Sequence, residues 1–154
     1  MTQPPRRTAT ILLVEDNRLD IELTLDAFKA SRLKNSLYVV RSGQEALDYL
    51  FGREPYNDRG KYPLPDIILL DLKLPGIDGH EVLRQIKTTP MIKRLPVIIL
   101  TSSQEEIDLS KSYDNGANSY LVKPLKAGTF LDVVRQINHY WLMLNISPPL
   151  TDSG

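Results

Sequence analysis

Residues 67–71 read IILLD, four apolar residues that end directly at an aspartate. A short apolar run with no charge inside it is typical of a strand that is covered on both faces, as the strands of a parallel sheet are. Four more runs of β-branched and aliphatic residues have this character: Thr10–Val14, Leu37–Val40, Val97–Leu100 and Tyr120–Val122. We interpret all five runs as strands.

Segments with helical spacing of apolar residues alternate with these strands. Ile21, Leu25 and Phe28 follow the i, i+4, i+7 pattern of one helix face. Similar stripes predict four more helices, within residues 46–51, 82–86, 107–113 and 130–144. Strands that alternate with helices predict an α/β fold, with a doubly wound, five-stranded parallel sheet and right-handed crossovers. The charged, turn-rich segment Arg53–Pro65 is expected to be a surface loop.

The composition limits the classes of function. The 154 residues include 19 Lys or Arg and 19 Asp or Glu, so the chain lacks the positive excess typical of nucleic-acid binding. The absence of cysteine excludes disulfides, thiolate zinc sites and a cysteine nucleophile. No segment reaches the ~20 apolar residues that cross a bilayer. We therefore expect a cytoplasmic protein that binds neither nucleic acid nor membrane.

The length predicts a single domain. We expect residues 1–9 to form a flexible arm, residues 10–144 the folded domain, and residues 145–154 a tail. Pro148 and Pro149 prevent a further helix in that tail, so no output domain is expected after the folded one.

Polar residues with a common chemistry follow four of the predicted strands. Glu15 and Asp16 follow the first strand, Asp71 the third, Thr101 the fourth and Lys123 the fifth. Functional residues of open parallel sheets gather at the carboxyl ends of the strands. Converging carboxylates repel by ~4 kcal/mol per pair at ~4 Å and an effective dielectric near 20, which Mg²⁺ would offset. Together with an ammonium and a hydroxyl, this set favours phosphoryl transfer, with Asp71 as a candidate nucleophile.

These residues resemble the receiver domain of two-component response regulators, from about Thr10 to Leu144. The motifs that carry the resemblance are Leu12–Asn17, Ile68–Asp71, Pro75 with Gly79, Leu100–Ser102 and Lys123-Pro124. The resemblance implies a CheY-like, flavodoxin-like (βα)5 fold with the strand order 2-1-3-4-5.

The resemblance also implies a role for each acidic residue. Asp71 would accept the phosphoryl group from a phosphohistidine on a sensor histidine kinase. Asp16 and Asp71 would bind Mg²⁺ through their carboxylates, the main-chain carbonyl of Lys73 would be another ligand, and Glu15 would act through water. Glu15 stands where aspartate is more usual in the family.

The remaining motif residues would bind or report the phosphoryl group. Thr101 would hydrogen-bond it, Lys123 would pair with it, and Tyr120 would be the rotating aromatic switch. The Lys123-Pro124 bond matches the family's cis peptide. Lys73 and Ser103 occupy the positions that tune the lifetime of the acyl phosphate, in a direction that the sequence leaves open.

The ends of the chain resemble one subgroup, the phytochrome-associated regulators of the Rcp type, through Arg53–Pro65, Tyr140-Trp141-Leu142 and Ser147-Pro148-Pro149. That subgroup implies a bacterial phytochrome as the kinase and a homodimer. A helix from Leu125 to Leu144 would span ~30 Å, whereas a strand of ~5 residues spans ~17 Å. The surplus apolar turns predict a dimer or partner face formed by Tyr140, Trp141 and Leu144. Packing of the same residues on their own sheet stays open.

Other functions fit less well. A phosphatase of the haloacid dehalogenase type needs a second aspartate two residues after the first, where this chain has Lys73. A flavin carrier needs a glycine- and hydroxyl-rich phosphate loop after the first strand, where Glu15 and Asp16 would repel the phosphate. A receiver-fold adaptor that acts without phosphorylation stays open. The sequence thus favours a signalling protein, not an enzyme, that acts on a separate downstream protein.

Overall fold

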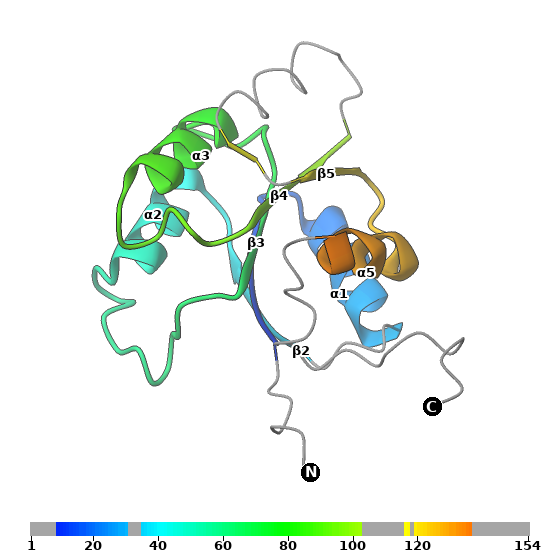
Figure 1. The fold of residues 1–154 in the computed structure, drawn as a ribbon, viewed down its shortest axis with the longest axis horizontal. Helices are drawn as coiled ribbons and strands as arrows, with labels where there is room; N and C mark the ends of the chain where they lie inside the picture. The colour runs from blue at the N-terminus through cyan, green and yellow to red at the C-terminus, as the bar shows by residue number, and fades with distance from the viewer. Residues whose placement is uncertain (1–8, 31–34, 103–115, 118, 137–154) are drawn as a thin grey trace.

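The computed structural model describes residues 9–30, 35–102, 116–117 and 119–136 (Figure 1). Five parallel strands form one sheet: β1 (Ala9–Val14), β2 (Asn35–Val40), β3 (Ile67–Leu70), β4 (Val97–Thr101) and β5 (Ser119–Val122). Their order in the sheet is β2-β1-β3-β4-β5, which confirms the predicted fold class and strand order. Ala9, assigned above to the arm, is the first residue of β1, because it is buried and pairs with Asn35.

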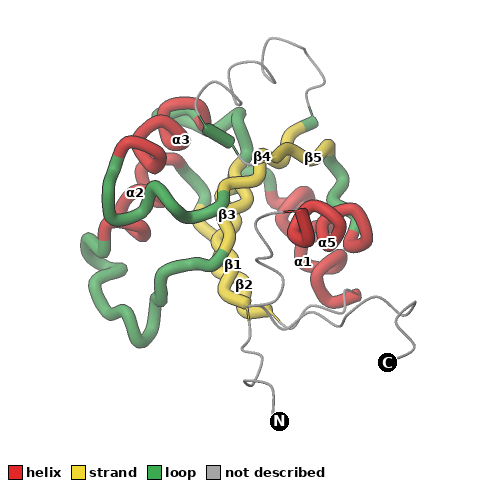
Figure 2. Tube along the Cα trace, viewed as in Figure 1, coloured by secondary structure: helices red, strands yellow, loops and turns green. Residues whose placement is uncertain are grey.

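Four helices of the described residues cover the two faces of the sheet: α1 (Arg18–Ala30), α2 (Gly43–Phe51), α3 (Gly79–Thr88) and α5 (Ala127–Gln136). Figure 2 shows α2 and α3 together on one face, and α1 and α5 together on the other. The helix predicted within residues 107–113 lies outside the described residues. None of the helices in the described part of the chain is both long and apolar enough to span a bilayer.

Successive side chains of a strand pack into two different hydrophobic cores, one on each face of the sheet, because side chains point alternately to the two faces. On β1, Ile11 and Leu13 pack with Phe28 of α1 and Phe130 of α5. Their neighbours Leu12 and Val14 pack with side chains of the opposite layer, which are Ala46, Leu47, Leu50, Val82, Leu83 and Ile86. The sheet is therefore covered on both faces, which explains why its central strand β3 is apolar throughout and why none of the five strands carries a charged residue.

The helices begin where short polar residues can accept hydrogen bonds from free backbone amides. Ser42 accepts from the amide of Glu45 at the start of α2, and Asp78 accepts from the amide of Glu81 at the start of α3. Gly52 ends α2 with a φ of 69°, a left-handed conformation that glycine adopts at little cost.

The segment Arg53–Pro65 lies at the amino end of β3 and packs through aromatic rings. Tyr56 and Tyr62 contact each other and the buried Tyr49 of α2, with ring centroids 4.9 to 5.9 Å apart, and Tyr38 of β2 completes the cluster. Arg59 donates hydrogen bonds to the backbone oxygens of Tyr49, Leu50 and Tyr62. The segment is a surface loop, as predicted, because most of its residues are exposed, and its aromatic rings and Arg59 hold it against α2.

Candidate functional site

The site residues continue the hydrogen-bond ladder of the sheet beyond the carboxyl ends of the strands. The Asp71 amide donates to the Val14 oxygen at 3.0 Å, one residue after β3 ends. The Lys123 amide donates to the Thr101 oxygen at 2.9 Å in the same way. The backbone of each residue is therefore held by its neighbouring strand, and the side chains leave the sheet from fixed points.

Three carboxylates meet at this edge. One oxygen from each of Glu15, Asp16 and Asp71 lies within 4.8 Å of the other two. Glu15 and Asp71 are buried, and Asp16 is exposed. Oxygen ligands at this separation, with one side open to water, fit a hard divalent cation such as Mg²⁺, which keeps part of its hydration shell.

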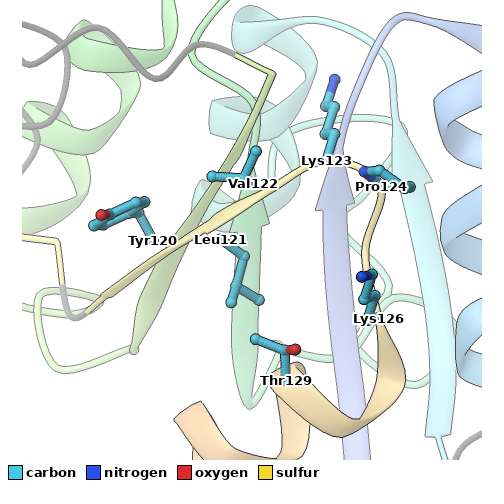
Figure 3. Close-up of a pocket in the computed structure, with 7 residues that line it drawn as sticks. All are labelled: Tyr120, Leu121, Val122, Lys123, Pro124, Lys126 and Thr129. Atoms are coloured by element: carbon cyan, nitrogen blue, oxygen red, sulfur yellow. The ribbon is translucent and has the colours of Figure 1, made fainter.

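The ammonium of Lys123 contacts three carboxylates. Its Nζ lies 2.5 Å from Oε1 of Glu15, 2.9 Å from Oδ2 of Asp20 and 3.2 Å from Oδ2 of Asp71. In Figure 3 the Lys123 side chain extends past the end of β1, away from the sheet. One half-buried cation thus contacts three anions at once.

Burial and charge shift the pKa values of this network. Burial raises the pKa of Glu15 to about 7; Lys123 acts to lower this pKa, and a hydrogen bond and charge repulsion from Asp71 act to raise it. Burial acts to lower the pKa of Lys123, but hydrogen bonds to Asp20 and Glu15 hold this pKa above its usual value. The ammonium therefore stays charged at neutral pH.

The loop from β3 to α3 folds back against the backbone next to Asp71. The Oδ1 atom of Asp71 accepts a hydrogen bond from the Lys73 amide at 3.1 Å. The Gly79 amide donates to the Leu72 oxygen at 3.0 Å. A β-carbon on Gly79 would lie 2.5 Å from the α-carbon of Leu72, closer than real contacts allow. Glycine at the start of α3 is what lets the helix approach the Asp71 backbone.

Thr101 is the last residue of β4, and its backbone oxygen accepts from the Lys123 amide, whereas Tyr120 lies on β5 three residues before Lys123. Thr101 is buried and Tyr120 is half-buried. A surface pocket of 540 Å³ runs along β5 and the start of α5, and its lining residues include Tyr120, Leu121, Lys123 and Thr129 (Figure 3). The side chains of Tyr120 and Leu121 project to opposite sides of the strand. The Lys123–Pro124 peptide bond is cis.

The structure thus brings Glu15, Asp16, Asp71 and Lys123 together at the carboxyl ends of β1, β3 and β5. It also adds Asp20, which the sequence analysis did not single out. Asp20 and Lys123 are 103 positions apart, and an aspartate in the first turn of a helix is ordinary. A signal was present in the sequence, because Asp20 lies four residues after Asp16, in the first turn of the helix that begins directly after the site residues of β1. Tyr140, Trp141 and Leu144 lie outside the described residues.

Comparison of the chain with known proteins identifies its family. The model of the response regulator receiver domain matches residues 11–135. The chain belongs to the response regulator receiver family. As a receiver, it is a signalling protein with a CheY-like fold, and its phytochrome-linked homologues agree with the resemblance given by its sequence.

Two curated relatives cover most of this receiver. The probable methanogenesis regulatory protein FilR2 of Methanothrix harundinacea is 43% identical over 138 residues, which is 90% of this chain and 86% of the relative. The response regulator Rcp1 of Synechocystis is 38% identical over 141 residues, which is 92% of each chain.

Three solved structures are similar in fold and sequence. The bacteriophytochrome response regulator AtBRR is 45% identical with a TM-score of 0.76, over 84% of this chain and 91% of that one. The phosphorylated cyanobacterial phytochrome response regulator RcpA is 40% identical with a TM-score of 0.73, over 88% of this chain and 95% of that one. The Mn²⁺-bound form of Rcp1 is 38% identical with a TM-score of 0.71, over 92% of this chain and 99% of that one.

Proposed function

We propose that this receiver accepts a phosphoryl group on Asp71 in a Mg²⁺-dependent reaction. The observation that carries the proposal is the place of Asp71 in the network: its Oδ2 atom lies 3.2 Å from the Lys123 ammonium, and an oxygen of Asp16 lies within 4.8 Å. A carboxylate beside a half-buried cation and further oxygen ligands is suited to act as a phosphoryl acceptor.

The phosphoryl donor would be a phosphohistidine on a sensor histidine kinase. A carboxylate oxygen of Asp71 attacks phosphorus, so that a P–O bond forms while the P–N bond breaks. The released histidine nitrogen takes a proton from solvent, and Asp71 is left as an acyl phosphate. Lys123 pairs with the phosphoryl oxygens and the Thr101 hydroxyl donates to them, which stabilises the charge that moves onto the receiver.

Asp16, Asp71 and the main-chain carbonyl of Lys73 would hold the metal ion, with Glu15 acting through water. When bound, Mg²⁺ neutralises negative charge on the carboxylates and on the transferred group. The Mn²⁺-bound form of Rcp1 supports a divalent cation in a receiver of this type. The donor set here is made of oxygen atoms alone, as Mg²⁺ prefers.

The signal would leave the receiver through a change of its surface. Phosphoryl oxygens draw Thr101 inward, and the vacated space admits Tyr120, which shifts the face around β5 and α5 between two packings. Tyr120→Ala is expected to leave phosphorylation intact and to weaken the response of the dimer or partner. Unchanged partner affinity in this variant would argue against the switch.

Similarity to the bacteriophytochrome response regulator AtBRR and to the cyanobacterial phytochrome response regulator RcpA supports a bacterial phytochrome as the kinase. The receiver would work in the cytoplasm, catalyse only its own phosphotransfer and dephosphorylation, and act on a separate downstream protein. Tyr140, Trp141 and Leu144 would form the face of a homodimer. Phosphotransfer from a purified bacterial phytochrome tests the kinase, and light scattering tests the dimer; the mass of one chain at micromolar concentration would contradict it.

Intact mass after incubation with acetyl phosphate and Mg²⁺ tests the central proposal. We expect one phosphate adduct on the wild type, and none with a chelator or in Asp71→Asn. Asp26→Asn is the matched control, because Asp26 is an exposed aspartate on α1, and it should form the adduct like the wild type. A folded wild type that forms no adduct with Mg²⁺ would instead favour the phosphorylation-independent adaptor.

A further inference from the structure

Asp20 takes one of the hydrogen bonds that Lys123 can give. Its Oδ2 atom accepts from Nζ of Lys123 at 2.9 Å, while Glu15 and Asp71 contact the same nitrogen. The same ammonium donates to Oδ2 of Asp71 at 3.2 Å and lies 2.5 Å from Oε1 of Glu15, so three carboxylates share one positive charge. A phosphoryl group on Asp71 would therefore compete with these carboxylates for the ammonium.

Burial indicates which partner gives way. The Glu15 side chain is 1% exposed, so losing Lys123 would leave a carboxylate buried without its cation, which is strongly unfavourable. The Asp20 side chain is 27% exposed and lies on the first turn of α1. Water can solvate Asp20 when Lys123 leaves it. Asp20 is thus the partner that releases the ammonium with the smallest loss.

The charge of Asp20 also acts on the phosphoryl group directly. Because Asp20 and Asp71 both contact one nitrogen, their Oδ2 atoms lie within about 6 Å of each other. A phosphoryl group adds negative charge at this place, where Lys123 is the cation that contacts the carboxylates. Repulsion from Asp20 therefore opposes the phosphorylated state, and does so more strongly than an exposed aspartate on another turn of α1 would.

We propose that Asp20 is a positioning residue for Lys123, and that its carboxylate competes with the phosphoryl group on Asp71 for the Lys123 ammonium. The inference rests on the proposed function and goes beyond it, because it assigns to a residue of α1 the control of how tightly the site holds a phosphoryl group.

Beryllofluoride, a stable mimic of the phosphoryl group, provides the first test. Its affinity is measured by titration of the full chain in Mg²⁺. Asp20→Asn keeps an oxygen that can accept from Lys123 but removes the charge, and we expect beryllofluoride to bind about tenfold more tightly, the order expected for one partly screened charge at ~6 Å. Asp26→Asn makes the same change of charge on an exposed turn of α1 and should bind as the wild type does.

The Lys123 ammonium provides a second test that needs neither metal nor phosphate. Its ¹H–¹⁵N signal in the metal-free protein, assigned by its loss in Lys123→Met, is expected to shift and broaden in Asp20→Ala, because an ammonium with fewer partners exchanges its protons faster. It should be unchanged in Asp26→Ala.

The outcomes separate the two proposals. An unchanged ammonium signal in Asp20→Ala would overturn the positioning role, and equal or weaker beryllofluoride binding by Asp20→Asn would overturn the competition. A lower melting temperature with both readouts unchanged would mean a purely structural aspartate and overturn both. A wild type that binds no beryllofluoride would overturn the proposed function and the competition with it, while the ammonium signal still decides the positioning role.

Discussion

The backbone oxygen of Asp71 lies where a side chain on residue 79 would begin, because a β-carbon on Gly79 would be closer to that oxygen than real contacts allow. Gly79→Ala must therefore displace either α3 or the backbone that carries Asp71. We expect a loss of about 2 kcal/mol in the free energy of unfolding, the usual size for forced overpacking, and slower formation of the phosphate adduct. Urea unfolding and intact mass measure the two effects.

Gly128 offers the matched control for this substitution. It lies in α5, and nothing lies within 4 Å of the position that its β-carbon would take. Gly128→Ala should leave the adduct unchanged and stabilise the chain slightly, because alanine favours the helix by up to ~1 kcal/mol. Equal stability of the two alanine variants would contradict the tight approach of α3 to Asp71.

Removal of the Lys123 ammonium should destabilise the metal-free protein. Lys123→Met leaves Glu15 and Asp71 buried without their cation, and the loss of one partner from a buried ion pair costs about 3 kcal/mol. Lys126→Met removes the same charge from an exposed side chain nearby and is expected to cost less than about 1 kcal/mol. Urea unfolding in the presence of a chelator compares the two; a loss of the same size in both would contradict the central place of Lys123.

The aromatic cluster predicts a loss of stability at alkaline pH. Burial raises the pKa of Tyr49 and that of Tyr56, whose hydroxyl also donates to Glu45 at 2.5 Å. The folded state holds these protons more tightly than the unfolded state does. The contribution of the two tyrosines to the free energy of unfolding is therefore complete below pH ~10, the ordinary tyrosine pKa, and is lost as the pH rises through the raised pKa of the folded state.

Unfolding of wild type and Tyr56→Phe between pH 8 and 11 measures this contribution. The wild type should lose more stability than Tyr56→Phe above pH 10, and tyrosinate absorbance should show a group of tyrosines that titrates only on unfolding. Parallel stability curves for the two proteins would argue against a raised pKa at Tyr56.

Two arginines of the segment Arg53–Pro65 should differ in their effect on stability. Arg59 donates to the backbone oxygens of Tyr49 and Leu50 at 2.8 Å, near the end of α2, so Arg59→Ala removes one hydrogen bond from each of these carbonyls and should cost about 2 kcal/mol. Arg53 pairs with Asp48 on the surface, and Arg53→Ala should cost less than about 1 kcal/mol. Limited proteolysis gives a second measurement, because only Arg59→Ala is expected to open the segment to cleavage.

Much of the fold could be predicted from the sequence because the sheet is covered on both faces. A run such as Ile67–Leu70 is apolar throughout, and the structure places it as β3 with the same bounds. The order of the strands came from the resemblance, since no residue spacing states which strands are neighbours. The site could be predicted because Asp71 and Lys123 directly follow their strands, at the carboxyl edge of the sheet.

What could not be predicted depends on contacts between distant parts of the chain. Tyr38, Tyr49, Tyr56 and Tyr62 come from a strand, a helix and a loop, and no periodic pattern links them. Their clustering holds the expected surface loop against α2, a contact that the sequence did not predict. Asp20 escaped notice for a similar reason, because the first turn of a helix often carries an acidic residue for local reasons.

The segment Arg53–Pro65 joins α2 to the amino end of β3, whereas the carboxylates lie at the carboxyl ends of the strands (Figure 1). The full length of β3 therefore separates the two regions. Asn57 and Asp58 are exposed at the far end from Asp71, and exposed loop tips tolerate inserted residues best. A fluorophore or an affinity tag placed between them would follow this receiver through binding experiments without standing in the path of its phosphodonor.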